Sequence, residues 1–146
     1  LEGIISLFPW IATVDAFQHW IYTNPDHTLE ARDTFWNELL DRFGGNIDWS
    51  GHELARTKMW HRQTHIFLVP FYYIEYGIAQ LGALGVWNNS KSDRLKALAD
   101  YKNALALGGS RPLPELFAAA NIPFRFDAEA FKPLIELVQR ELAALR

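Results

Sequence analysis

Apolar residues recur at helical spacing along much of the chain. In the first stretch, about residues 4 to 22, the regularly spaced apolar positions are Ile11, Val14, Phe17 and Ile21. Steps of about three and four residues place such side chains on one face of a helix. No strand-like alternation of apolar and polar residues lasts longer than a few positions. The pattern therefore predicts an all-α fold.

Turn and capping residues delimit a second predicted helix. Helix-breaking residues at positions 23–26 end the first stretch. Thr28 is the expected N-cap of a helix over residues 29–43, because its hydroxyl can accept a hydrogen bond from a first-turn N–H. Gly44 and Gly45 are expected to end this helix with a left-handed C-cap.

The middle of the chain predicts two helical segments around a proline. Ser50 followed by Glu53 fits the capping-box pattern, so a helix is expected to begin near residue 51 and to run to about residue 69. Pro70 ends or kinks this helix, because proline lacks the N–H of the helical ladder. Helical character resumes over residues 71–87.

The last third predicts further helices separated by short turns. A turn at residues 88–90 precedes a helix over residues 93–107. Asp127 is the expected cap of the final helix. Pro133 lies late for a first-turn proline, which favours a start of that helix near Lys132.

The apolar run over residues 66–87 is long enough to span a membrane. Pro70, Glu75 and Gln80 interrupt it, and a carboxylate in the middle of a span is costly in lipid. The run therefore predicts a buried helix and no membrane partner. Glu75 is expected to be buried and paired there, since unpaired carboxylates are rare in protein interiors.

The composition suits a single helical unit spanning residues 1–146. Apolar residues make up 49% of the chain and charged residues 21%, as in ordinary globular domains. The net charge of −3, without a stripe of Lys or Arg, excludes nucleic acid as an expected partner. The chain has no cysteine, which removes thiol catalysis and disulfides and favours a cytoplasmic location. Its first residues lack the pattern of a signal peptide.

Two histidine pairs are candidates for chemistry. His61 and His65 are four residues apart, which on one helix would place both imidazoles on the same face. The glutamate of an H-E-x-x-H zinc motif is absent between them, so they form either a weak zinc pair or two half-buried, hydrogen-bonded imidazoles. Asp15 and His19 have the same spacing, which suits either an oriented imidazole or a simple helix contact.

The densest polar and aromatic group is the tyrosine cluster Tyr72, Tyr73 and Tyr76. Tyr73 and Tyr76 are three residues apart and Tyr72 and Tyr76 are four apart, so either pair can share a helix face. A phenol is a neutral donor at pH 7. Directed at a substrate carbonyl, it would stabilise an oxyanion; directed inward, it would satisfy a buried partner.

Around these tyrosines the sequence resembles oligoendopeptidase F-type enzymes, which are related to thimet oligopeptidase. The segment WHRQTHIFLVPFYYIEYGIAQLGALGVW carries the resemblance, with FPWIATVDAFQHWIYTNPDHT before it and LADYKNALALGGSRPLPELFAAANIPF after it. The resemblance extends from about Gly3 to Leu145. It implies the C-terminal, multi-helix part of a zincin-type oligopeptidase catalytic domain.

The resemblance also implies a chemistry, metal-assisted hydrolysis of short peptides. Family members hold zinc through H-E-x-x-H and a further glutamate, which are expected upstream of Leu1. His65 matches the family's substrate-binding histidine. Tyr73 and Tyr76 best match the tyrosines that bind substrate and stabilise the oxyanion, and Tyr72, also expected to bind substrate, replaces one of them if the register differs by one residue.

The missing zinc motif sets further expectations for the isolated chain. We expect no zinc and no peptide cleavage without the N-terminal part of the same enzyme. Apolar surface left uncovered by that part favours a homo-oligomer. The alternative hypothesis is a non-catalytic helical module that binds peptides or a partner helix through its aromatic surface.

Overall fold

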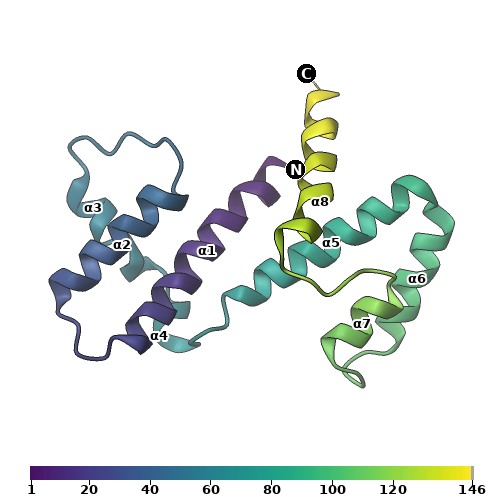
Figure 1. Ribbon diagram of the computed structural model, residues 1–146, viewed down its shortest axis with the longest axis horizontal. Coiled ribbons are helices and arrows are strands. Elements are labelled where there is room, and N and C mark those ends of the chain that lie inside the picture. Colours follow the sequence, from purple (N-terminus) through teal and green to yellow (C-terminus); the bar gives the residue numbers. More distant parts are fainter. Residues whose placement is uncertain (146) are drawn as a thin grey trace. The chain divides into compact units, whose positions relative to one another are not determined.

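A computed structural model describes residues 1–145 as helices joined by turns and short loops (Figure 1). No strand occurs among these residues, and the prediction of an all-α fold is confirmed. In chain order the helices are α1 (Glu2–Thr23), α2 (Leu29–Phe43), α3 (Glu53–Thr57), the 3-10 helix η1 (Met59–Arg62), α4 (His65–Leu68), α5 (Ile74–Ser92), α6 (Arg94–Ala106), α7 (Leu113–Ala119) and α8 (Ala128–Ala143).

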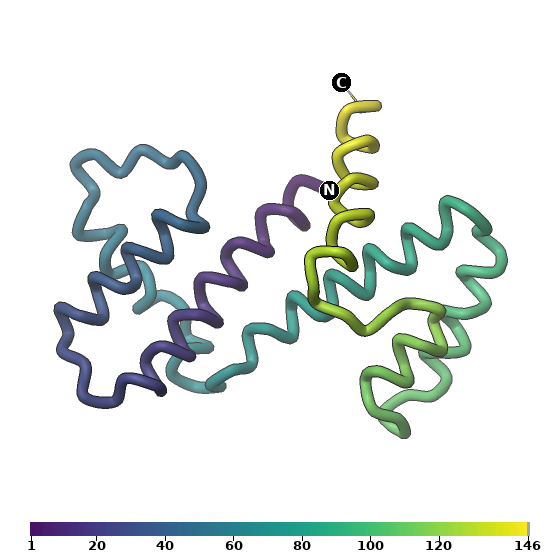
Figure 2. Tube along the Cα trace, in the orientation of Figure 1, coloured from purple at the N-terminus to yellow at the C-terminus, as the bar shows by residue number. Residues whose placement is uncertain are grey.

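Contacts within the chain divide it into two compact units. The first is Gly3–Gly77, the purple-to-teal part of the trace in Figure 2. The second consists of Ile78 and the residues that follow it, together with Leu1–Glu2. The first turn of α5 therefore belongs to the first unit and the rest of this helix to the second. That the chain acts as one helical unit of a larger catalytic domain stays a prediction.

The core of the first unit is built from aromatic side chains. Phe17 of α1 and Trp36 of α2 are completely buried and meet edge to face, with ring centroids 4.9 Å apart. Trp60 of η1 contacts Phe17 at 5.5 Å, and Trp10 contacts Trp36 at 5.7 Å. Edge-to-face pairs contribute about 0.5–1.5 kcal/mol beyond the burial of their area. Much of the aromatic content of the sequence is therefore core.

The second helix forms as its sequence predicts. Helix α2 covers Leu29–Phe43, and the hydroxyl of Thr28 accepts a hydrogen bond of 3.1 Å from the N–H of Ala31. Gly44 closes the last turn, and Gly45 has a φ of +72°, the left-handed conformation that glycine adopts readily. Both expected boundaries of this helix are confirmed.

The predicted continuous helix over residues 51–69 is wrong. The chain instead forms α3, η1 and α4 in succession. The capping box is not made: Glu53 accepts from the N–H of Gly51 at 2.9 Å and not from that of Ser50, and the hydroxyl of Ser50 donates to Asp48 at 2.7 Å. The residue that precedes α3 as its N-cap is His52.

A tertiary contact accounts for the early end of α3. The indole N–H of Trp36 donates to the backbone carbonyl of Arg56 at 3.1 Å. In a longer helix that carbonyl would accept from the N–H of Trp60. The break after Thr57 lets the ring of Trp60 enter the core, where it is 4% exposed.

Three expectations for α5 are also wrong. Helix α5 begins at Ile74 and not at Phe71, because Phe71 has a φ of +61° and lies outside the helical region. The helix then continues through the expected turn at residues 88–90, where the side chain of Asn89 donates to the carbonyl of Asn121 at 2.9 Å. Glu75 is exposed rather than buried.

The second unit packs α5, α6, α7 and α8 around a smaller core. Leu84 of α5 and Val138 of α8 are at most 2% exposed. Asp127 caps α8 by accepting from the N–H of Ala130 at 3.1 Å, so the helix begins at Ala128. The expected start near Lys132 is wrong, and Pro133 is accommodated within the helix.

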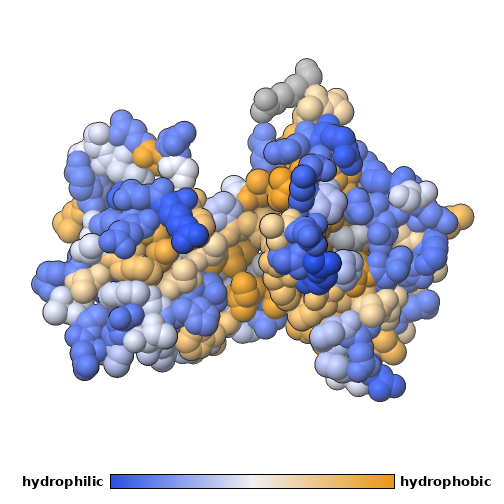
Figure 3. All heavy atoms as spheres, viewed as in Figure 1, coloured by the Kyte–Doolittle hydropathy of each residue, from blue (hydrophilic) through white to orange (hydrophobic). Residues whose placement is uncertain are grey.

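Both units expose apolar as well as polar side chains. In the face shown in Figure 3, hydrophobic areas interrupt the hydrophilic surface. Within residues 1–145 we find no helix with the length and the apolar character needed to cross a lipid bilayer.

Candidate functional site

The candidate site lies in the first unit, where the chain passes from α4 into α5. Gln18 of α1 holds this passage in place. Its amide group donates to the carbonyl of Ile66 at 3.3 Å, and its side-chain oxygen accepts from the N–H of Phe71 at 3.1 Å. Because Gln18 is completely buried, α1 fixes the backbone on both sides of Pro70.

This backbone path brings the predicted site residues together. The ring of His65 lies edge-on to Tyr73 at 5.0 Å and to Tyr76 at 5.6 Å, measured between ring centroids. It stacks more loosely on Tyr72 at 6.3 Å. Tyr73 lies in the turn before α5, and its ring contacts that of Tyr76 at 5.0 Å. The imidazole therefore lies among three phenols.

A row of hydrogen bonds runs through the imidazole. Nε2 of His65 lies 3.0 Å from the phenol oxygen of Tyr76. On its other side, Nδ1 of His65 lies 2.7 Å from the amide nitrogen of Gln63. The amide oxygen of Gln63 accepts from the indole N–H of Trp10 at 3.2 Å. Both ring nitrogens of His65 thus have partners.

The three phenols differ in exposure. Tyr73 is 9% exposed, whereas Tyr76 is 38% and Tyr72 49% exposed. Burial raises the pKa of Tyr73, and the neighbouring Tyr76 raises it further, while the N–H of Trp10 acts in the opposite direction. Tyr76 and Tyr72 can therefore contact a ligand from solvent, whereas the mostly buried Tyr73 packs against the ring of Tyr76.

Gln63 and Trp10 were not among the residues predicted for this site. Gln63 lies two positions before His65, a spacing that does not place two side chains on the same face of a helix, and Trp10 lies far away in the sequence. The sequence offered no local signal for either residue beyond the polar group that each side chain carries. Their role depends on the tertiary fold that brings α1 beside the end of η1.

The predicted same-face arrangement of His61 and His65 is wrong. His61 belongs to η1 and His65 begins α4, with a break at residues 63–64. The ring of His61 packs edge-on against Trp60 at 3.9 Å. Among residues 1–145, no group of three or more His, Cys, Asp or Glu side chains is placed to hold a metal ion. These residues do not fit a catalytic zinc site.

The second predicted pair is a contact within α1. Nε2 of His19 lies 3.6 Å from a carboxylate oxygen of Asp15, and the side chain of His19 is 63% exposed. Exposed pairs of this kind contribute a few tenths of a kcal/mol. The pair is therefore a local helix contact.

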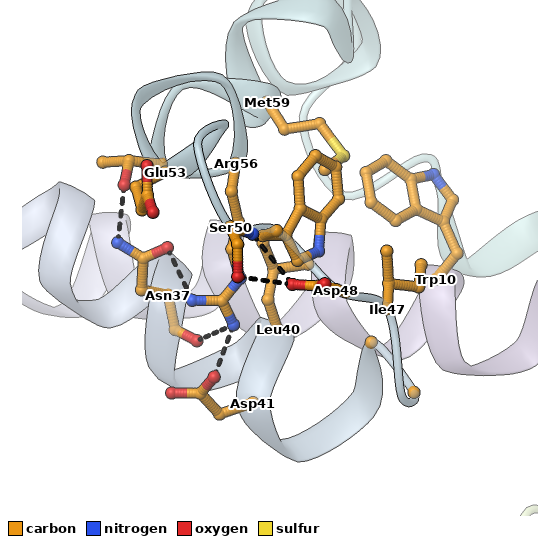
Figure 4. A pocket seen from close by; sticks show the side chains of 14 residues that line it. Trp10, Asn37, Leu40, Asp41, Ile47, Asp48, Ser50, Glu53, Arg56 and Met59 are labelled. Carbon is orange, nitrogen blue, oxygen red and sulfur yellow. Dashed lines mark hydrogen bonds and ion pairs between the residues drawn. The ribbon is translucent and has the colours of Figure 1, made fainter.

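A separate pocket of about 740 Å³ lies between α2 and the segment before α3 (Figure 4). Within it, Arg56 pairs with Asp41 and donates to the side chain of Asn37 at 3.2 Å. The residues that line it include Trp10 but none of the three tyrosines. This pocket is therefore separate from the tyrosine cluster.

Comparison with known proteins identifies the family of the chain. Residues 1–132 match the sequence model of Peptidase family M3. The chain belongs to this family. The match includes the whole first unit, with the tyrosine cluster, and the second unit as far as residue 132. No curated protein sequence matches the chain significantly.

Solved structures of peptidases share the fold of this M3 chain. An X-ray structure of a protein provisionally named oligoendopeptidase F is 36% identical, with a TM-score of 0.88 over 97% of this chain and 25% of that one. The structure of PZ peptidase A with an inhibitor is 32% identical, with a TM-score of 0.85 over 93% and 24%. A provisionally named oligoendopeptidase F from Bacillus anthracis str. Ames is 29% identical, with a TM-score of 0.74 over 97% and 22%.

The chain thus spans about a quarter of the length of these solved peptidases. The resemblance to oligoendopeptidase F seen in the sequence is confirmed, as is the assignment to an all-α part of such an enzyme.

Proposed function

We propose that this chain is the part of a zinc metalloendopeptidase that binds short peptides and stabilises the oxyanion formed during their hydrolysis. The observation that carries the proposal is the contact between His65 and Tyr76, 3.0 Å long, at the exposed edge of the tyrosine cluster. Membership in a peptidase family supports the reaction class. The zinc ligands belong to other parts of the polypeptide, because the residues described here do not fit a metal site.

The exposure of the phenols divides the proposed roles. Tyr76 donates its hydroxyl to the oxygen of the peptide carbonyl as negative charge develops there, the task of an oxyanion-hole donor. His65 assists substrate binding and holds Tyr76 in position. Tyr73 is mostly buried and supports Tyr76 through ring contact, while the exposed Tyr72 contacts the bound peptide.

The isolated chain is proposed to be inactive and to need the N-terminal part of the same enzyme as its partner. Helix α6 supports this partnership, because it exposes apolar side chains at nearly helical spacing: Leu95, Leu98, Tyr101 and Leu105. Such a stripe normally packs against another element. Without that element, the same stripe favours association between copies of the chain. A cytoplasmic location is proposed from the absence of cysteine.

The test uses the chain joined to, or co-expressed with, the upstream portion of its polypeptide. Tyr76→Phe is expected to lower kcat about 10²-fold, the effect of removing one oxyanion donor. His65→Ala is expected to lower kcat/KM as well. Tyr22→Phe, at an exposed position of α1, is the matched control and should leave both constants unchanged. Full activity of both site variants would disprove the proposed roles.

A second candidate function is the binding of a peptide or partner helix without cleavage. An apolar cleft of about 560 Å³ in the second unit favours it, with Gly82, Tyr101 and Phe117 among its lining residues. Clefts of this size and character are typical of ligand sites. Binding of a short peptide to the isolated chain, unchanged by zinc or chelator, would support this candidate. Loss of that binding in Gly82→Leu would locate it to the cleft.

A further inference from the structure

The donor and the acceptor of each hydrogen bond around His65 can be assigned in turn, starting from Trp10. An indole N–H can only donate. Its partner at 3.2 Å must therefore be the oxygen of the Gln63 amide and not its nitrogen. The donor of Trp10 thus fixes which way round the Gln63 side chain lies.

The orientation of Gln63 then fixes the protonation of the imidazole. With its oxygen facing Trp10, the amide presents its NH₂ group to Nδ1 of His65 at 2.7 Å. An NH₂ group donates, so Nδ1 must accept, and a neutral imidazole then carries its proton on Nε2. The opposite tautomer would require Gln63 to turn over, and its NH₂ group would then face the N–H of Trp10.

The proton on Nε2 determines what Tyr76 can do. Nε2 lies 3.0 Å from the phenol oxygen, so the N–H of His65 donates to that oxygen. The hydroxyl proton of Tyr76 must then point away from His65. Since Tyr76 is 38% exposed, this proton is available to an acceptor arriving from solvent.

We propose that Gln63 and Trp10 are positioning residues that hold His65 in its Nε2–H tautomer and so keep the hydroxyl of Tyr76 available as a donor. In this role both residues act through His65 and not directly on the peptide. The use of this donor on a peptide carbonyl rests on the proposed function, whereas the tautomer is a property of the chain alone. The two statements can therefore fail separately.

The tautomer can be read directly by NMR. Long-range ¹H–¹⁵N correlations of the imidazoles in the ¹⁵N-labelled chain distinguish a protonated from an unprotonated ring nitrogen. At about pH 9, where imidazoles are ordinarily neutral, we expect His65 to show the proton on Nε2. Its signals are assigned from their loss in His65→Ala. A proton on Nδ1, or an even mixture of the two tautomers, would overturn the proposal.

Gln63→Glu provides the decisive variant, because a carboxylate accepts but cannot donate. Nδ1 of His65 must then carry a proton to face it, so the spectrum should change to the Nδ1–H tautomer or to the imidazolium. Gln139→Glu, at an exposed position of α8, is the matched control and should leave the His65 signals unchanged. An unchanged spectrum in Gln63→Glu would overturn the proposal.

Gln63→Met keeps the length of the side chain but removes its donor, and it replaces Gln63→Glu if the latter does not fold. The expected result is a mixture of tautomers at His65, and retention of pure Nε2–H would count against the proposal. In the assembled enzyme, Gln63→Glu should lower kcat at least tenfold with little change in KM. If Tyr76→Phe leaves kcat intact while the tautomer is as expected, the proposed function fails and the positioning role of Gln63 remains.

Discussion

The side-chain oxygen of Gln18 accepts a hydrogen bond of 3.1 Å from the backbone N–H of Phe71, the residue with a φ of +61° directly after Pro70. Non-glycine residues in the left-handed region cost about 1–2 kcal/mol each. The same side chain donates to the carbonyl of Ile66 at 3.3 Å. One buried glutamine of α1 therefore holds an unfavourable backbone turn, and this turn places Tyr73 and Tyr76 beside His65.

Replacing Gln18 by alanine is expected to lower the free energy of unfolding by about 1–3 kcal/mol, since it leaves the buried carbonyl of Ile66 and the N–H of Phe71 without this partner. Urea unfolding followed by circular dichroism measures this change. Gln139→Ala, at an exposed position of α8, should stay within about 0.5 kcal/mol of the parent chain. Equal stabilities of the two variants would show that Gln18 does not hold the turn.

A second prediction concerns Gly85 of α5. Alanine usually stabilises a helix relative to glycine, but at this position we expect alanine to lower the stability of the chain. A Cβ atom at Gly85 would lie 2.7 Å from Cγ2 of Ile122, and 3.2 and 3.3 Å from its other two outer carbons. Because all three are close, rotation of the Ile122 side chain does not relieve the contact. Gly85→Ala is expected to cost about 1–3 kcal/mol, the range for overpacked cores.

The control for Gly85 lies in the same helix. A Cβ at Gly77 would have its nearest contact at 3.5 Å, an ordinary van der Waals distance. Gly77→Ala should therefore be neutral or stabilising by up to about 1 kcal/mol. The double variant Gly85→Ala with Ile122→Ala should be more stable than the sum of the single effects predicts. Simple additivity would contradict the assigned clash.

A third prediction follows from the buried phenol of Tyr73. Burial raises the pKa of Tyr73 above that of a phenol in the unfolded chain, which is about 10. The contribution of this group to stability is then fully present below about pH 10 and is lost as the pH rises through the folded-state pKa. The free energy of unfolding should fall over that range, and Tyr73→Phe should fall less steeply. Tyr101→Phe serves as control, and a parallel fall in both variants would contradict the assignment.

The sequence was sufficient where local signals determine the structure. Thr28 and Asp127 cap α2 and α8 through hydrogen bonds within one turn, and both caps were identified from residue type and position. Pro133 was misjudged because a proline penalises a helix interior without forbidding it. Helix α8 accepts this cost once Leu137 and Val138 are buried.

Tertiary contacts explain the errors in the middle of the chain. The end of α3 depends on a donor from Trp36, twenty residues earlier, and the passage of α5 through residues 88–90 accompanies a contact with Asn121. Neither partner can be read from a local pattern. The tyrosine cluster was recognised from residue type and spacing, and the roles of its members came from the resemblance, whereas Gln63 and Trp10 required the fold.

The last prediction concerns zinc, and it follows from the surroundings of the two candidate histidines. Nδ1 of His65 accepts from Gln63 and Nε2 faces Tyr76, so neither nitrogen offers a free lone pair to a metal. His61 lies on a different element and packs on Trp60.

After dialysis against trace zinc, elemental analysis of the isolated chain should find below roughly 0.1 zinc per chain, because a genuine structural site binds tightly enough to survive dialysis. The chain assembled with the upstream part of its polypeptide is the positive control and should retain about one zinc, as expected for a catalytic zinc site. A stoichiometric metal in the isolated chain that disappears in His61→Ala would show that these residues rearrange into a site, and the tautomer of His65 would then have to change as well.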